Sequence, residues 1–194
     1  MTRSRRTLDP GYFDALYAAD PDPWKFASSA YEREKYAVTL AALTRERYEN
    51  AFEIGCSIGV LTERLAARCD RLLAVDVAFA ALELARRRCA SAACVRFERM
   101  CVPVEWPNGT FDLILASEVV YYLDAHDVAR LADRIAGALA PRGDLVLVHW
   151  TGETDYPLTG DEATARLIAG LGDRLAILRQ ARFAEFRLDL LTRR

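Results

Sequence analysis

The sequence predicts one α/β domain built on a doubly wound, Rossmann-like sheet of seven mostly parallel strands, with helices on both faces. The chain has 194 residues, which suits one domain, and 52% of them are hydrophobic, which is enough for a buried core. From residue 51 onward, short apolar runs alternate with stretches of helical periodicity, as in a parallel sheet with helical crossovers. The first apolar run ends in a glycine-containing turn at residues 53–59, where such folds bind ligands.

Residues 1–50 are expected to form a helical arm, and residues 51–194 the Rossmann-like core. Asp9 and Pro10 are typical of a helix start, and aromatic residues follow at helical spacing. Two prolines exclude a helix at residues 20–24, and helical periodicity returns at residues 31–47. The arm therefore precedes the sheet rather than forming a second domain.

The core is expected to contain seven strands separated by helices. The first five strands are predicted at residues 51–54, 71–76, 94–98, 111–116 and 144–150. Helices are predicted at residues 60–68, 79–89 and 124–139, the last of them closed by Pro141-Arg142-Gly143. After a polar loop at residues 151–160, we expect a helix at residues 161–171 and strands at residues 175–180 and 183–191.

Charge and cysteine content exclude several classes of function. The 26 basic and 28 acidic residues leave a net charge of −2, so nucleic-acid binding is not expected. Five cysteines without a C-x-x-C pair predict reduced thiols, and only two histidines, His126 and His149, make a metal site unexpected. His126 is expected to be exposed at a helix start. Neither a signal peptide nor a membrane span is recognisable, so we expect a cytoplasmic protein; its oligomeric state is not predicted.

The turn after the first strand is the predicted cofactor site. Glu53, Gly55 and Gly59 match an acid followed by G-x-G-x-G, with Cys56 between them and Ser57 in place of the middle glycine. Asp76 ends the second strand, where a carboxylate accepts hydrogen bonds from a ribose diol. A dinucleotide fingerprint would need glycine at positions 57 and 60, so NAD and FAD are not expected.

This loop resembles the S-adenosylmethionine loop of class I methyltransferases. Further similar segments are Pro107-Asn108-Gly109-Thr110-Phe111-Asp112, Ala116-Ser117-Glu118-Val119-Val120-Tyr121-Tyr122 and Leu139-Ala140-Pro141-Arg142-Gly143. Asp22-Pro23-Trp24 and Tyr31-Glu32-Arg33-Glu34-Lys35-Tyr36 resemble, more narrowly, the nodulation protein S family of N-methyltransferases, which act on the free amine of a deacetylated chitooligosaccharide.

The resemblance implies roles for residues around the cofactor. Glu53 is expected near the ammonium group of the methionine moiety. Cys101 stands where the family usually has an acid that meets adenine, so adenine recognition is expected to use backbone groups of Cys101 and Val102 and apolar packing. The remaining residues expected at the cofactor are Val77, Ser117, Trp24 and Arg33.

The acceptor side of the site is predicted at the ends of the fourth and fifth strands. Methyl transfer from a sulfonium is an in-line displacement that needs a neutral amine, so a nearby base is useful. The candidates for a catalytic role are Glu118, Tyr121 and His149. Tyr122, Trp150 and Tyr31 are expected to contact the acceptor, whereas Lys35 is expected on a solvated helix face.

Three other functions fit parts of the sequence. Gly55-Cys56-Ser57-Ile58-Gly59 also matches the G-x-S-x-G elbow of α/β-hydrolases, with Ser57, Asp112 and His149 in triad order, although a first-strand position is unusual for it. An O-methyltransferase of a natural product or carboxylic acid would use the same cofactor loop. A non-catalytic module that binds S-adenosylmethionine or a partner chain is the third alternative.

Overall fold

Seven strands form one mixed sheet in the computed structural model, which describes residues 3–194; residues 1 and 2 of the predicted domain lie outside the described part. The strand order is β3-β2-β1-β4-β5-β7-β6. The strands are β1 (Ala51–Ile54), β2 (Leu72–Asp76), β3 (Val95–Arg99), β4 (Phe111–Ser117), β5 (Leu139–Trp150), β6 (Leu175–Arg182) and β7 (Phe186–Arg193). Only β7 runs antiparallel to its neighbours, β5 and β6. The predicted fold class is confirmed.

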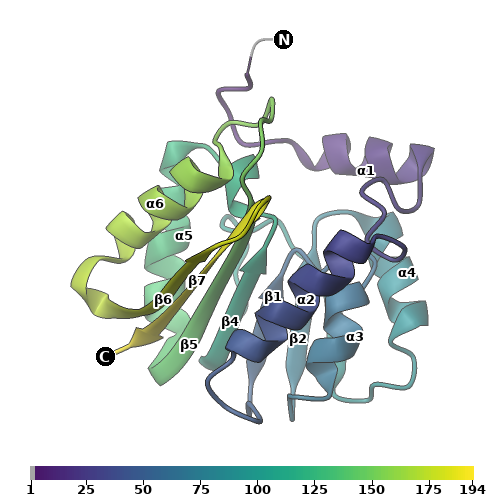
Figure 1. Ribbon diagram of the computed structural model, residues 1–194. Helices are drawn as coiled ribbons and strands as arrows, with labels where there is room; N and C mark the ends of the chain where they lie inside the picture. Colours follow the sequence, from purple (N-terminus) through teal and green to yellow (C-terminus); the bar gives the residue numbers. More distant parts are fainter. Residues whose placement is uncertain (1–2) are drawn as a thin grey trace.

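Helices cover both faces of the sheet (Figure 1). They are α1 (Pro10–Ala19), α2 (Ala30–Ala42), α3 (Val60–Ala66), α4 (Phe79–Arg88), α5 (Ala125–Ala138) and α6 (Gly160–Leu171), with short 3₁₀ helices η1 (Val120–Tyr122) and η2 (Gly172–Arg174). In Figure 1, α5 and α6 lie on one face and α2, α3 and α4 on the other. Helix α1 crosses the edge at which the parallel strands end, next to α4.

The central strands are mostly apolar because both of their faces are buried. In β4, Leu113 and Leu115 belong to the core beneath α2 and α3, whereas Ile114 and Ala116 belong to the core beneath α5 and α6. Asp9 caps α1 through the Gly11 N–H, as the sequence predicted. The rigid centre of the sheet therefore fixes where β1 and β4 end, and with them the polar residues that follow.

Three predicted boundaries are wrong by three or more residues. Helix α2 ends at Ala42 rather than at residue 47, because the backbone is already extended at Leu43; Tyr48 then forms a β-bridge with Cys69. Strand β5 begins at Leu139, which pairs with Phe111, so the Pro141-Arg142-Gly143 turn lies inside the strand as an irregularity. Strand β7 begins at Phe186 rather than at residue 183, because Phe183 belongs to the hairpin turn and its N–H donates to the Phe186 carbonyl.

Within residues 3–194, none of the helices combines the length and apolar character needed to cross a membrane.

Candidate functional site

A cavity lies at the edge where the parallel strands end, bounded by the arm above it. It holds about 1020 Å³ of space, part of it open to solvent. Most of the predicted site residues line this cavity: Glu53, Gly55, Cys56, Ser57, Asp76, Val77, Cys101, Val102, Ser117, Glu118, Tyr122 and Trp24. The predicted residues that do not line it are Gly59, Arg33, Tyr31, Tyr121, His149 and Trp150.

The loop between β1 and α3 needs its two glycines for different reasons. Gly55 has φ +79°, and a Cβ atom there would lie 2.1 Å from the Val119 side chain. Gly59 also has φ +79°, but a Cβ atom there would meet Ala85 of α4 at 3.0 Å. Gly55 thus lets the loop approach the segment after β4, whereas Gly59 packs the loop against α4 and does not line the cavity. Both positions exclude larger residues.

Ser57 occupies the middle position of the loop in a left-handed conformation, with φ +49°, which favours glycine. Its backbone N–H donates to Asp76 Oδ2 at 2.9 Å, and its hydroxyl pairs with the hydroxyl of Tyr17 in α1. The serine therefore connects the loop both to the end of β2 and to the arm. Tyr17 lines the cavity, a role that the sequence analysis did not assign to it.

Asp76 holds the loop and still has acceptor capacity. Its Oδ1 accepts the Ala78 N–H at 2.9 Å, and its Oδ2 accepts the Ser57 N–H. Burial raises the pKa of Asp76, although these backbone hydrogen bonds oppose the increase. Each carboxylate oxygen can accept a second hydrogen bond, so a ribose diol still fits here.

Glu53 is a buried carboxylate with an unused oxygen. It is 1% exposed, and its Oε2 has no hydrogen-bond partner among residues 3–194. Burial, together with the nearby Asp76 carboxylate, raises its pKa to about 7. An unpaired buried carboxylate is costly, and a cation in the cavity would satisfy it. The ammonium group of S-adenosylmethionine fits this position.

The segment after β3 is apolar where it meets the cavity. Met100, Cys101 and Val102 line it, and burial raises the pKa of the Cys101 thiol. The Cys101 N–H already donates to the Glu105 carboxylate at 2.6 Å. The Cys101 carbonyl also accepts the Glu105 N–H, at 2.9 Å. An adenine ring placed here would meet the apolar side chains of this segment, and its recognition by backbone groups of Cys101 and Val102 stays a prediction.

Glu118 follows β4 and lines the cavity in a left-handed conformation, with φ +57°. Its Oε1 accepts the Lys35 ammonium at 2.5 Å, and its Oε2 accepts the Tyr121 hydroxyl at 2.7 Å and the Trp150 N–H at 2.8 Å. Burial alone would raise the pKa of Glu118, but the Lys35 charge and these hydrogen bonds outweigh it and lower the pKa. Glu118 is therefore held as an ionised carboxylate. Tyr121 and Trp150 do not line the cavity, but their hydrogen bonds hold the Glu118 carboxylate in place.

Lys35 was expected on a solvated helix face, and this prediction is wrong. The residue is 1% exposed, and its ammonium donates to Glu32 at 2.9 Å as well as to Glu118. It also lies 5.0 Å from the centre of the Tyr31 ring. The polar face of α2 is buried because it packs above the end of β4. The sequence contained one indication of this burial: Lys35 and Tyr36 lie three and four residues after Glu32, on one face of the helix, beside aromatic residues.

The predicted arm residues divide into two groups. Trp24 lines the cavity and packs edge-on against Tyr17, with ring centres 5.8 Å apart. Arg33 instead donates to the Ser28 carbonyl at 2.8 Å and does not line the cavity, so the structure does not bring it to the cofactor site. Tyr31 packs on Phe186 and supports Lys35 rather than facing the cavity.

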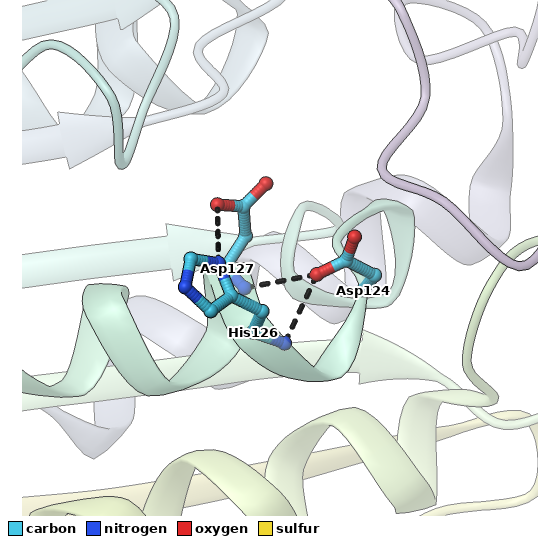
Figure 2. A group of neighbouring side chains, drawn as sticks. All are labelled: Asp124, His126 and Asp127. Carbon is cyan, nitrogen blue, oxygen red and sulfur yellow. Dashed lines mark hydrogen bonds and ion pairs between the residues drawn. The ribbon is translucent and has the colours of Figure 1, made fainter.

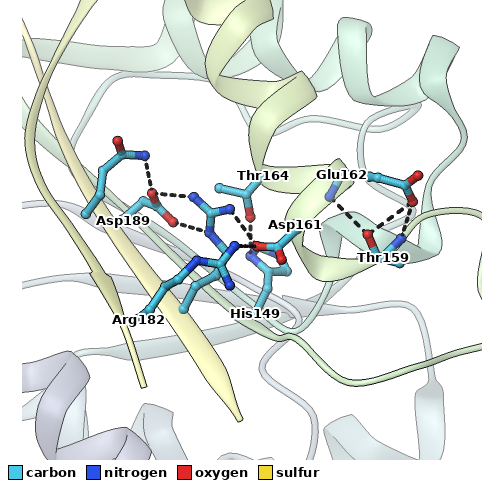
Figure 3. Close-up of polar contacts among 9 residues, drawn as sticks. His149, Thr159, Asp161, Glu162, Thr164, Arg182 and Asp189 are labelled. Atoms are coloured by element: carbon cyan, nitrogen blue, oxygen red, sulfur yellow. Dashed lines mark hydrogen bonds and ion pairs between the residues drawn. The ribbon is translucent and has the colours of Figure 1, made fainter. Parts of the chain in front are cut away.

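The structure does not bring His149 to the cavity. His149 is 0% exposed; its Nε2 accepts the Val120 N–H at 3.2 Å, and its Nδ1 lies 3.3 Å from the Thr164 hydroxyl. Burial lowers its pKa to about 4. Figure 3 shows His149 beside Thr164, near the ion-paired Asp161 and Arg182. A base must reach the acceptor, and this geometry instead makes His149 a link between β5, η1 and α6.

The hydrolase triad is not assembled. Asp112 lies at the start of β4 and accepts the Glu49 and Asn50 N–H groups at 2.8 and 2.9 Å. Ser57 lies beyond the opposite ends of the parallel strands, and His149 is in the core. A nucleophile and its base must be within hydrogen-bond reach, so the elbow-like sequence is a loop of another kind.

One cluster has metal-ligand residue types: Asp124, His126 and Asp127 (Figure 2). Asp124 is the N-cap of α5 and accepts the N–H groups of His126 and Asp127, each at 3.0 Å. Asp127 accepts the Thr7 hydroxyl at 2.6 Å and pairs with Arg130. His126 is exposed, as predicted. Helix capping accounts for the cluster without a metal.

Comparison with known proteins places the chain in a family. The family model for nodulation protein S (NodS) matches residues 15–149. Nodulation protein S from Rhizobium tropici is 37% identical over 131 residues, which cover 66% of this chain and 55% of that protein. The alignments span only 55–61% of the length of the first three curated relatives.

Solved structures agree over more of the chain. A Pseudomonas syringae protein assigned as a methyltransferase is 42% identical, with a TM-score of 0.74 over 85% of this chain and 100% of that one. N-methyltransferase NodS from Bradyrhizobium japonicum, solved with S-adenosylhomocysteine, is 25% identical, with a TM-score of 0.80 over 96% and 99% of the two chains. The predicted relationship is confirmed: the chain belongs to the nodulation protein S family.

Proposed function

We propose that this protein transfers the methyl group of S-adenosylmethionine to the nitrogen of a small-molecule amine, such as a deacetylated amino sugar or chitooligosaccharide. The family supports the reaction class. The acceptor is proposed from the chemistry of the cavity and from the N-methyltransferase relative.

The residues of this chain would bind the cofactor along the edge of the sheet. Glu53 would pair with the ammonium group, Asp76 would accept hydrogen bonds from the ribose diol, and the segment around Cys101 and Val102 would pack on adenine. When bound, the cofactor supplies an electrophilic methyl group on a sulfonium. Residues 3–50 cover part of the cavity through Tyr17 and Trp24, which would help to exclude water from the reacting atoms.

The observation that carries the choice of acceptor is the carboxylate of Glu118, which lines the same cavity as five aromatic side chains of the arm. The arm-side wall of the cavity is lined by Phe13, Tyr17, Trp24, Phe26 and Tyr36. A carboxylate beside aromatic rings attracts an amine and repels an acid, so an acceptor that is itself a carboxylic acid is disfavoured. Glu118 is proposed to bind and orient the amine rather than to take its proton, because the lowered pKa makes it a weak base.

The test begins with calorimetric titration of the purified protein with S-adenosylhomocysteine, with NAD as the control ligand. We expect micromolar binding of the former and none of the latter. Methyl transfer is then measured with fully deacetylated chitotetraose and with its N-acetylated counterpart, which lacks a free amine. Turnover of the first alone supports the proposal, and methylation of the second would indicate an oxygen acceptor. Cofactor binding without turnover of any amine would favour the non-catalytic alternative.

A further inference from the structure

Lys35 joins the arm to the acceptor side of the cavity by a buried chain of charges. Its ammonium lies between Glu32 of its own helix and Glu118, at 2.9 and 2.5 Å. Glu32 Oε2 has no hydrogen-bond partner among residues 3–194. The three side chains together carry a net charge of −1 when both carboxylates are ionised, and only Glu118 of the three lines the cavity.

Other titratable or charged groups face these three from each element packed against them. Tyr31 and Tyr36 lie on α2, Glu53 on β1, Tyr121 on η1, and His149 on β5, and Glu185 lies in the hairpin before β7. The tyrosines stay neutral because burial raises their pKa values, and His149 stays neutral because burial lowers its pKa to about 4. Lys35 is the positive charge that contacts Glu118.

A carboxylate beside an acceptor amine has two opposing effects. It strengthens binding of the amine as an ammonium ion, but it also raises the pKa of that amine, and an ammonium ion has no lone pair for attack. For transfer, the amine must release a proton to solvent. Its lone pair then forms the N–C bond as the C–S bond breaks, which gives a methylated ammonium product and a neutral thioether.

We propose that Lys35 is a positioning residue that sets, through Glu118, how readily the bound acceptor amine loses its proton. The inference rests on the proposed amine acceptor. By pairing with Glu118, Lys35 offsets part of the negative charge near the amine. The amine still binds, but its pKa is raised less, so it can lose its proton. Burial raises the pKa of Glu32, although the Lys35 charge opposes the increase. When it is ionised, Glu32 acts in the opposite sense, because its charge offsets part of that of Lys35.

The proposal requires pH shifts of opposite sign from two substitutions. Lys35→Met leaves the amine facing more negative charge, so the acidic limb of the kcat–pH profile should move up by about one pH unit, with a lower KM for the amine below that limb. Glu32→Gln removes a negative charge, so the same limb should move down by about half a unit or more and KM should rise. Lys35→Arg keeps the charge, and its limb should stay within about 0.3 unit of the wild type.

The profiles are measured with fully deacetylated chitotetraose or, if it is not methylated, with glucosamine and ethanolamine, at saturating S-adenosylmethionine. Binding of S-adenosylhomocysteine and the melting temperature are recorded for each variant to show that it is folded. Opposite shifts support the inference, since lost packing alone would not move the two limbs apart. Shifts of the same sign, or none, overturn it while the proposed function stands.

Lys35→Met exposes two buried carboxylates to each other and is the variant most prone to unfold. If it does not fold, the other two variants decide the question. A downward shift of the acidic limb of the kcat–pH profile in Glu32→Gln, with an unchanged limb in Lys35→Arg, supports the proposal. An upward shift in Glu32→Gln, or none, refutes it. If no amine is methylated although S-adenosylhomocysteine binds, both the inference and the proposed function are refuted.

Discussion

Replacing Glu53 by glutamine should stabilise the protein and weaken its cofactor binding at the same time. The folded protein holds Glu53 with a pKa of about 7, against an ordinary value of 4.5. An acid with a raised folded pKa imposes no penalty below pH 4.5, and it destabilises the fold progressively as the pH rises from 4.5 through 7. The difference of about 2.5 pH units corresponds to about 3 kcal/mol at pH 8. Glu53→Gln removes this penalty.

The assay is urea unfolding of the ligand-free protein and the variant between pH 5 and 8. The free energy of unfolding of Glu53→Gln minus that of the wild type should increase with pH and approach about 3 kcal/mol at pH 8. The difference is used because His149 titrates in the opposite sense in both proteins. Glu63→Gln is the matched control, since Glu63 is exposed in the first turn of α3. A difference that is flat with pH would refute the assigned burial of the Glu53 charge.

Cofactor affinity supplies the second half of this prediction. If the ligand ammonium pairs with ionised Glu53, affinity for S-adenosylhomocysteine should rise about tenfold between pH 6 and 8, as the ionised fraction rises from about 0.1 to 0.9. Glu53→Gln should bind more weakly and lose this pH dependence. Methylthioadenosine, which has no ammonium group, is the control ligand and should show neither effect. Equal pH dependence for both ligands would exclude the proposed ion pair.

Three further outcomes are expected. Asp76→Ala should lower affinity for S-adenosylhomocysteine by more than about tenfold, because it removes both the loop contact and the ribose acceptor. Asp133→Asn, at an exposed position of α5, should not, and calorimetry distinguishes the two variants. Tyr17→Phe should raise the KM for S-adenosylmethionine several-fold with less than about 2 kcal/mol of destabilisation, since it removes one hydroxyl contact to Ser57; an unchanged KM would show that the arm contact does not serve cofactor binding. His149→Gln should leave the shape of the kcat/KM–pH profile unchanged, because His149 does not reach the cavity; loss of a limb near neutral pH would restore it as a base.

Local sequence brings more of the predicted cofactor residues than of the predicted acceptor residues to the cavity. Glu53, Gly55 and Asp76 lie directly at strand ends, so recognising β1 and β2 places them without further knowledge of the fold. Lys35 and His149 depend on what packs above them. The alternation of β5 indicates that one face is buried, but only the position of α6 shows that Thr164 and Val120 satisfy the imidazole.

The arm shows the same limit more clearly. The first-turn signal at Asp9 and Pro10 predicts α1, and the helical spacing of its aromatic residues is visible in the sequence. Tyr17 and Ser57, whose hydroxyl groups are in contact, lie 40 residues apart along the chain, so no local sequence pattern predicts this contact. The polar face of a helix is usually exposed to solvent. On α2 the polar residues Glu32 and Lys35 are buried instead, because the helix lies over Glu118, with which Lys35 pairs.

The two glutamates of the cavity, Glu53 and Glu118, differ in pKa because their surroundings differ. Both are buried, which raises each pKa, but only Glu118 has a cation of the protein beside it. Glu53 is therefore ionised at neutral pH only in part until a ligand supplies the missing charge, whereas Glu118 is ionised before any ligand arrives. It follows that cofactor binding should take up little or no proton at Glu118 and release one at Glu53. Calorimetry in buffers of different ionisation enthalpy, near pH 6.5, would detect that release in the wild type and not in Glu53→Gln.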